Sequence, residues 1–149
     1  MADTLFINED FFKKNISHRQ SFDSAQVIST IRLVQKTNLI SIITLPVYDY
    51  FQTSLADISL LTDAETKLFE SIQLFLAVKS AEELLYAAPT TDIDNKSGAH
   101  LSYNNKSVLM EARMVRDINR DTTLLALAQS GSDEFDDEEM DVQGGFYFG

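Results

Sequence analysis

The side chains that could hold a metal ion or catalyse a reaction are few in this sequence and lie scattered along it. The strongest candidate is Asp92–Gly98, where acidic and amide residues recur as they do in a calcium-binding loop. The stretch departs from that pattern, because its glycine comes one position late, Lys96 stands at the fifth position and Tyr103 replaces the bidentate glutamate. We interpret it as a turn and not as a metal site.

Catalytic side chains are not grouped anywhere in the sequence. The two histidines, His18 and His100, each lack a second histidine or a carboxylate at the spacing of metal ligands, and the chain has no cysteine. It contains no glycine-rich phosphate loop, no nucleophile elbow and no zinc-protease motif. We therefore predict that the protein is not an enzyme and that it uses no metal ion or other cofactor.

Charge is the most unevenly distributed property of the chain, whose net charge is −11. Its basic residues cluster only at Lys13–Lys14 and in a stripe on the last predicted helix, so tight binding to phosphate groups is not expected. The stripe consists of Arg113, Arg116 and Arg120. Such a stripe is most often a solvated helix face; the alternative is an interface between subunits that takes acidic side chains from a neighbour.

Residues 132–149 contain seven acidic residues and no basic one. A composition of this kind favours disorder in isolation. The segment also carries large apolar side chains, which are suited to anchoring on a partner, so we predict a partner-binding tail. The apolar anchors are Phe135, Met140, Phe146, Tyr147 and Phe148, and the acids are Asp133, Glu134, Asp136, Asp137, Glu138, Glu139 and Asp141.

The longest periodic stretch runs from Thr62 to Pro89 and predicts one long helix. Thr62 and Glu65 have the spacing of a capping box at its start, and the proline lies just past its end. The apolar residues of this helix cover more than one face. That pattern predicts contacts on two sides, either at the centre of a bundle or between the subunit's own core and a second subunit.

Three further helices are predicted on either side of the long one. One covers 21–41, and a short one covers 46–54 with Pro46 in its first turn. The last covers 107–129, with Ser107 as its cap. Together with the long helix they make about four helices that can pack into a small bundle.

The first 22 residues are predicted to form an arm. Leu5–Ile7 is expected to be a short strand, and Asn8 is expected to cap one or two helical turns. The apolar pair Phe11–Phe12 needs a surface to cover it. That surface is either the chain's own core or a neighbouring subunit.

Residues 90–105, between the last two long helices, predict a β-hairpin. Thr90–Asp94 and Ala99–Tyr103 alternate in character, and Asn95–Gly98 between them is rich in turn-forming residues. A hairpin of two strands is only marginally stable alone. We therefore expect it to rest on the bundle or to pair with a hairpin from another copy.

These patterns predict a mainly α-helical protein: a small bundle of about four helices, a β-hairpin between the last two long helices and an extended C-terminal tail. The 149 residues fit one domain, with the arm at 1–22, the helical domain at 23–131 and the tail at 132–149. No apolar run reaches the ~20 residues that span a bilayer, and the first ten residues do not resemble a signal peptide. We expect a cytoplasmic product, a class that includes phage proteins made in the host cytoplasm.

The run from Phe22 to Phe51 resembles the opening part of tailed-bacteriophage head–tail connector proteins, also called adaptor, ring or head-completion proteins. Those proteins show a helix that ends in a Q-x-x-x-[IL]-x-x-[IL]-L run, then a short tyrosine-bearing helix and then a long helix. Here the run begins at Gln35 and ends at Ile43, and Val47-Tyr48 follows. The glycine that often precedes the short helix is replaced by Thr44-Leu45-Pro46, and the tail after Gly131 matches no part of the pattern.

The resemblance implies a structural virion protein that assembles as a homo-oligomeric ring, commonly of twelve copies, beneath the portal protein. Such a ring extends the DNA channel, joins the phage head to the tail and contacts further neck or tail ring proteins. DNA passes through without specific binding, and an acidic wall suits that role because it repels phosphate. The implied location is the virion neck.

A ring also suggests how the long helix is used. One side of it would form the subunit's own core, including Phe75 and Leu76. The other side would lie at or near the seam between subunits, where the polar residues are Lys67, Lys79 and Glu83.

Two other interpretations remain open from the sequence. One is a different virion component, such as a tail-completion or stopper protein. The other is a soluble regulator whose acidic tail binds a basic partner or imitates nucleic acid. The aromatic C-terminus favours the virion proteins weakly, because a nucleic-acid mimic needs charge more than it needs Phe146–Phe148.

Overall fold

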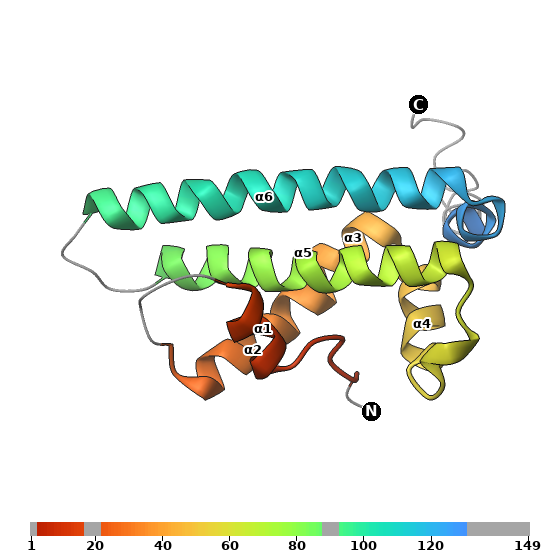
Figure 1. Ribbon diagram of the computed structural model, residues 1–149, viewed down its shortest axis with the longest axis horizontal. Coiled ribbons are helices and arrows are strands. Elements are labelled where there is room, and N and C mark those ends of the chain that lie inside the picture. The colour runs from red at the N-terminus through yellow and green to blue at the C-terminus, as the bar shows by residue number, and fades with distance from the viewer. Residues whose placement is uncertain (1–2, 17–21, 88–92, 131–149) are drawn as a thin grey trace, which may run out of the picture.

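The computed structural model describes residues 3–16, 22–87 and 93–130, and every regular element within them is a helix. The tail at 132–149 lies outside the described residues. Figure 1 shows two long helices side by side, with the shorter helices gathered along one side of the pair. In chain order the elements are α1 (Glu9–Asn15), α2 (Ser24–Val34), a π-helical turn (Gln35–Leu39), α3 (Ile40–Ile43), α4 (Leu45–Ser54), a 3₁₀ turn (Ile58–Leu60), α5 (Asp63–Ala87) and α6 (Ile93–Arg120), and residues 122–130 form one more helix.

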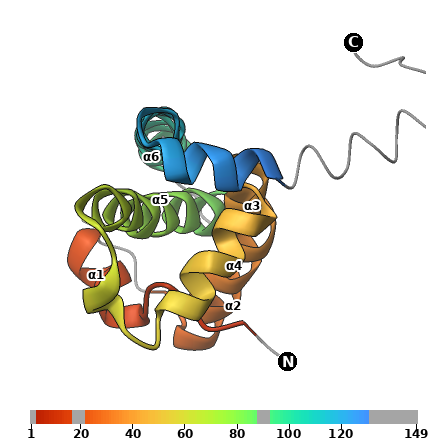
Figure 2. The same ribbon diagram turned by 90° about the vertical axis from the view of Figure 1, so that its right-hand side faces the viewer.

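Helix α5 is the centre of the molecule. It runs antiparallel to α6 on one side and packs against α1 and α2 on the other (Figures 1 and 2). The predicted capping box is confirmed: Thr62 N donates to Glu65 Oε1 at 2.9 Å, and Glu65 N donates to Thr62 Oγ1 at 3.1 Å. Phe75 and Leu76 are buried in the core as predicted. The wide apolar surface of α5 is thus covered within one chain, as at the centre of a bundle.

The predicted β-hairpin at 90–105 is wrong. Residues 93–105 belong to the first half of α6, so Asn95–Gly98 is part of a helix and not a turn. Tertiary contacts explain why this stretch is helical. Tyr103 is buried, and Asn104 and Ser107 reach across to the buried Glu82 on α5. These contacts with α5 outweigh the weak local preference of an Asn- and Gly-containing stretch.

The last predicted helix also differs in its bounds. Ser107 is not a cap but a buried residue in the interior of α6. The chain breaks its helix at Asp121, whose side chain accepts a hydrogen bond from Leu124 N at 3.0 Å and so caps the helix at 122–130. Leu124 is fully buried, and this shorter helix lies over α3 in Figure 2.

The first helical pair follows the prediction more closely. The expected helix at 21–41 is α2, the π-helical turn and α3 in unbroken succession, and Pro46 stands in the first turn of α4 as expected. Thr44 separates α3 from α4 and has φ 76° and ψ 158°, a region that only glycine enters without strain.

We expect the Thr44→Gly substitution to stabilise the protein by about 1 kcal/mol, because it relieves this backbone strain. It also removes Thr44 Oγ1, a buried oxygen with no hydrogen-bond partner among the described residues. Urea unfolding monitored by circular dichroism measures the change. Thr53→Gly is the matched control: Thr53 is exposed within α4, so glycine there should destabilise. A Thr44→Gly protein that is less stable than the parent would contradict the argument.

The N-terminal arm packs on the chain's own core. Asn8 caps α1 as predicted, with its side chain accepting from Phe11 N at 2.8 Å. Phe12 is buried and Phe11 is partly buried against the core. Leu5–Ile7 is not a strand, and the side chains of Phe6 and Ile7 are buried instead. Phe6 contacts Tyr48 and Phe69 edge-to-face, with ring centroids 5.5 and 5.4 Å away.

Candidate functional site

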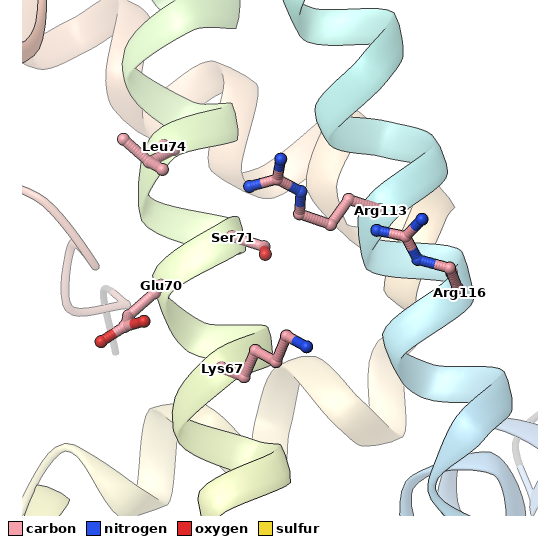
Figure 3. Close-up of a pocket in the computed structure, with 6 residues that line it drawn as sticks. All are labelled: Lys67, Glu70, Ser71, Leu74, Arg113 and Arg116. Atoms are coloured by element: carbon pink, nitrogen blue, oxygen red, sulfur yellow. The ribbon is translucent and has the colours of Figure 1, made fainter.

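The predicted arginine stripe is exposed on α6, but it divides between two surfaces. Arg113 and Arg116 line a cleft of about 380 Å³ between α5 and α6, together with Lys67, Glu70, Ser71 and Leu74. We call this the cationic cleft (Figure 3). Arg120 lies outside it. Sequence reasoning missed the part that Lys67 plays here, because Lys67 lies on α5 and is distant in sequence from the two arginines on α6.

The cations of the cleft lack acidic partners among the described residues. The ion pairs among the described residues lie elsewhere: they join Lys13 to Glu9, Lys36 to Asp3, and Lys79 to both Glu82 and Glu83. None of them involves Lys67, Arg113 or Arg116. In a chain of net charge −11, a cleft with three such cations is suited to bind carboxylates or other anions.

A second surface covers the outward side of α6. Val108, Leu109 and Val115 are 55%, 66% and 42% exposed, so the helix presents large apolar side chains to solvent. Arg116 and Arg120 border a shallow hollow that includes Val108 and Val115. We call this the outer face of α6. Arginine is enriched at protein interfaces, so exposed apolar side chains beside Arg116 and Arg120 suit contact with another protein.

Glu82 is a buried carboxylate that the sequence analysis did not single out. Its side chain accepts hydrogen bonds from Asn104 Nδ2 at 2.9 Å and Ser107 Oγ at 3.0 Å, and Lys79 Nζ lies 3.3 Å away. Burial alone would raise the pKa of Glu82, but the hydrogen bonds from Asn104 and Ser107 and the charge of Lys79 outweigh it and hold the pKa below its ordinary value. The group joins α5 to α6 as a charged structural contact.

The residues predicted to lie at the seam between subunits, Lys67, Lys79 and Glu83, have neighbours within the same chain. Lys79 bridges Glu82 and Glu83, the latter at 3.6 Å, and Lys67 belongs to the cationic cleft. Their place relative to another subunit stays a prediction.

A buried polar cluster fixes the arm to α4 and the π-helical turn. Gln35 is 1% exposed; its Oε1 accepts from Phe6 N at 2.8 Å, and its Nε2 lies 2.8 Å from Thr4 O and 3.1 Å from Tyr48 Oη. Tyr48 Oη donates to Asp3 Oδ2 at 2.6 Å. Burial and this bond raise the pKa of Tyr48 to about 12. The bonds from Tyr48 and Lys36 hold the pKa of Asp3 below its ordinary value.

No group of three histidine, cysteine or carboxylate side chains is placed to hold a metal ion in the part of the chain that the structure describes. Nor is any helix among these residues both long and apolar enough to cross a bilayer. The anchors and acids predicted in the tail lie beyond the last described residue, Ser130. They are Phe135, Met140, Phe146, Tyr147, Phe148, Asp133, Glu134, Asp136, Asp137, Glu138, Glu139 and Asp141.

Comparison of the chain with family models, with curated proteins and with solved structures gives no match.

Proposed function

We propose that the chain is a structural virion protein, a head–tail connector that forms a homo-oligomeric ring under the portal of a tailed phage. The observation that carries the proposal is the order of helices around Gln35 and Tyr48. A helix ends in the run that begins at Gln35, the short α4 carries Tyr48, and the long α5 and α6 follow. The two residues meet in the core at 3.1 Å, so the part of the sequence that carries the resemblance is also a structural unit.

In this proposal the ring extends the DNA channel and joins the head to the tail. Twelve copies would make it, as is common in the connectors that the sequence resembles. The outer face of α6 is available for contacts with neighbouring copies, the portal protein or further neck proteins. The acidic chain lets DNA pass without specific binding. The proposal gives the chain a place in the virion neck and no catalytic role.

Electron microscopy of particles from the phage that encodes the chain tests this function. Antibody or gold label directed at a tag on the chain should mark the neck, at the junction between head and tail. Loss of the gene should yield filled or partly filled heads without attached tails. Label on the capsid shell or the tail fibre, or normal particles without the gene, would overturn the proposal.

Deleting residues 132–149 should leave the helical domain folded, because the core described above lies within residues 5–128. The deletion should abolish docking of the ring, since a ring multiplies weak contacts and losing them lowers avidity by about 10²–10⁴-fold. Thermal melting checks the fold, and microscopy of particles checks docking.

A triple substitution separates the aromatic anchors from the acids of this tail. Phe146→Ala, Tyr147→Ala and Phe148→Ala together keep all seven acids. If the aromatic residues anchor the tail on the portal or the next ring, the triple variant should fail to dock like the deletion. Virions that assemble normally with the tail deleted would refute an anchoring role.

A further inference from the structure

The cationic cleft gathers three positive side chains from two helices. In Figure 3 Lys67 extends from α5 toward α6, and Arg113 and Arg116 extend from α6 toward α5. The carboxylate of Glu70, which also lines the cleft, points away from α6. The groups best able to neutralise an anion therefore converge, while the lining acid is directed elsewhere.

The charge of the cleft is only partly offset from within the described residues. Asp117 is buried on α6, where it accepts a hydrogen bond from Ser71 Oγ at 3.4 Å. Asp117 and Glu70 together supply two negative charges against three positive ones. Positive charges held close together repel, so an anion in the cleft lowers the energy of the arrangement.

The acidic run at 133–141 has the complementary chemistry. It holds the seven acids of the tail and no basic residue. Nine extended residues span about 30 Å, whereas Arg113 and Arg116 are separated by about 4.5 Å along their helix. The run can therefore place several carboxylates on one cleft at the same time, and arginine binds carboxylates through paired hydrogen bonds.

The direction of the chain favours a tail from another molecule. Figure 3 looks onto the cleft with α2 to α4 behind the two long helices. Figure 2 shows the helix at 122–130 running from the end of α6 to the α3 side, and Leu124 is buried there. The described part of the chain thus ends on the side of the α5–α6 pair opposite the cleft.

We propose that the cationic cleft of Lys67, Arg113 and Arg116 binds the acidic segment 133–141 of a second copy of this chain. The contact links copies head to tail, which in a closed arrangement gives a ring. It does not depend on a place in the virion. If the contact is not found, the proposed location in the virion is unaffected. If the location is wrong, the proposed contact is unaffected.

Carbodiimide cross-linking of an isotope mixture tests the contact. Full-length protein of natural isotope content is mixed with the ¹⁵N-labelled full-length protein at the highest concentration at which neither precipitates. Carbodiimide joins a carboxylate to the lysine amine with loss of water, so a bound tail becomes attached to Lys67 Nζ as an amide. After digestion, mass spectrometry should find Lys67 joined to the tail in pairs with one light and one heavy partner. Lys106, exposed on α6 outside the cleft, gives the background yield.

The double substitution Arg113→Gln and Arg116→Gln should lower the Lys67–tail yield about tenfold. Arg120→Gln is the matched control on the same helix and should leave the yield unchanged. High salt should reduce the yield in the unaltered protein, which checks the electrostatic contact without any substitution. Three results would overturn the proposal: a Lys67 yield no higher than that of Lys106, links confined to pairs of equal isotope, or a yield unaffected by the double substitution.

Discussion

Replacing Glu82 with alanine should destabilise the protein by about 2–3 kcal/mol. The side chain is 4% exposed and lies between α5 and α6. Without it, Asn104 and the buried Ser107 lose the acceptor that they share, and Lys79 is left with the more distant Glu83 among the described residues. The free energy of unfolding in urea, near neutral pH, measures the loss.

The same contact predicts how stability depends on pH. Hydrogen bonds and Lys79 hold the pKa of Glu82 below its ordinary value in the folded protein. The ionised group therefore stabilises the fold above the pKa of the unfolded chain, about 4.3. That stabilisation should disappear as the pH falls through the lower, folded pKa. The Glu82→Ala protein should lose less stability than the parent over this acidic range.

Glu83→Ala provides the matched control for both measurements. Glu83 is the next residue in the chain and also pairs with Lys79, but its side chain is 47% exposed. Its removal should change the unfolding free energy by no more than about 0.5 kcal/mol. Equal effects of the two substitutions would mean that the buried contact between α5 and α6 is not what stabilises the pair.

Signals that act within a few residues were predicted correctly from the sequence. The Thr62–Glu65 capping box, the Asn8 cap and the place of Pro46 are each fixed by neighbouring backbone groups. Such features depend on hydrogen bonds inside one turn, so the local sequence contains the information. Contacts on two sides of α5 were also predicted, because its apolar residues cover more than one face, but the sequence left open whether the second side faces the bundle or another subunit.

Features that depend on contacts between distant residues were missed. The helix over 93–105 is supported by the hydrogen bonds from Asn104 and Ser107 to Glu82 on α5 and by the burial of Tyr103, and the sequence shows only the weak local preference of this stretch. The cap at Asp121 was overlooked because the apolar spacing continues through Leu124 and Leu125. The helical break there turns the apolar side of 122–130 onto the core.

In the candidate site, too, local spacing was read correctly and a contact between distant residues was missed. Spacing along the sequence placed Arg113 and Arg116 in one predicted stripe, and acidic side chains of a neighbouring subunit were one of its two predicted surroundings. That spacing did not indicate Lys67, which joins the two arginines only through the packing of α5 on α6. The contact between Gln35 and Tyr48 was not predicted either, because the two side chains meet only when α4 packs against the π-helical turn.

Replacing Gln35 with alanine should cost about 2–4 kcal/mol and should release the N-terminal arm from the bundle. Gln35 accepts from Phe6 N and donates toward Thr4 O and Tyr48 Oη, all within 3.1 Å. Alanine leaves the buried Phe6 amide without this acceptor, and it leaves a cavity where the buried Gln35 side chain stood. Urea unfolding measures the energy, and hydrogen exchange of the Phe6 amide reports the release of the arm.

Gln52→Ala distinguishes the buried contact from a general loss of amide bonds. Gln52 also holds the arm, through Thr4 N at 3.0 Å and Thr4 O at 2.7 Å, but these bonds lie at the surface. Water can replace them, so the cost should be about 1 kcal/mol or less and the Phe6 amide should stay protected. If Gln35→Ala leaves that amide as slow to exchange as Gln52→Ala does, the arm is held by its apolar side chains and not by Gln35. The contact of Gln35 with Tyr48 would then have no role in ordering the N-terminus.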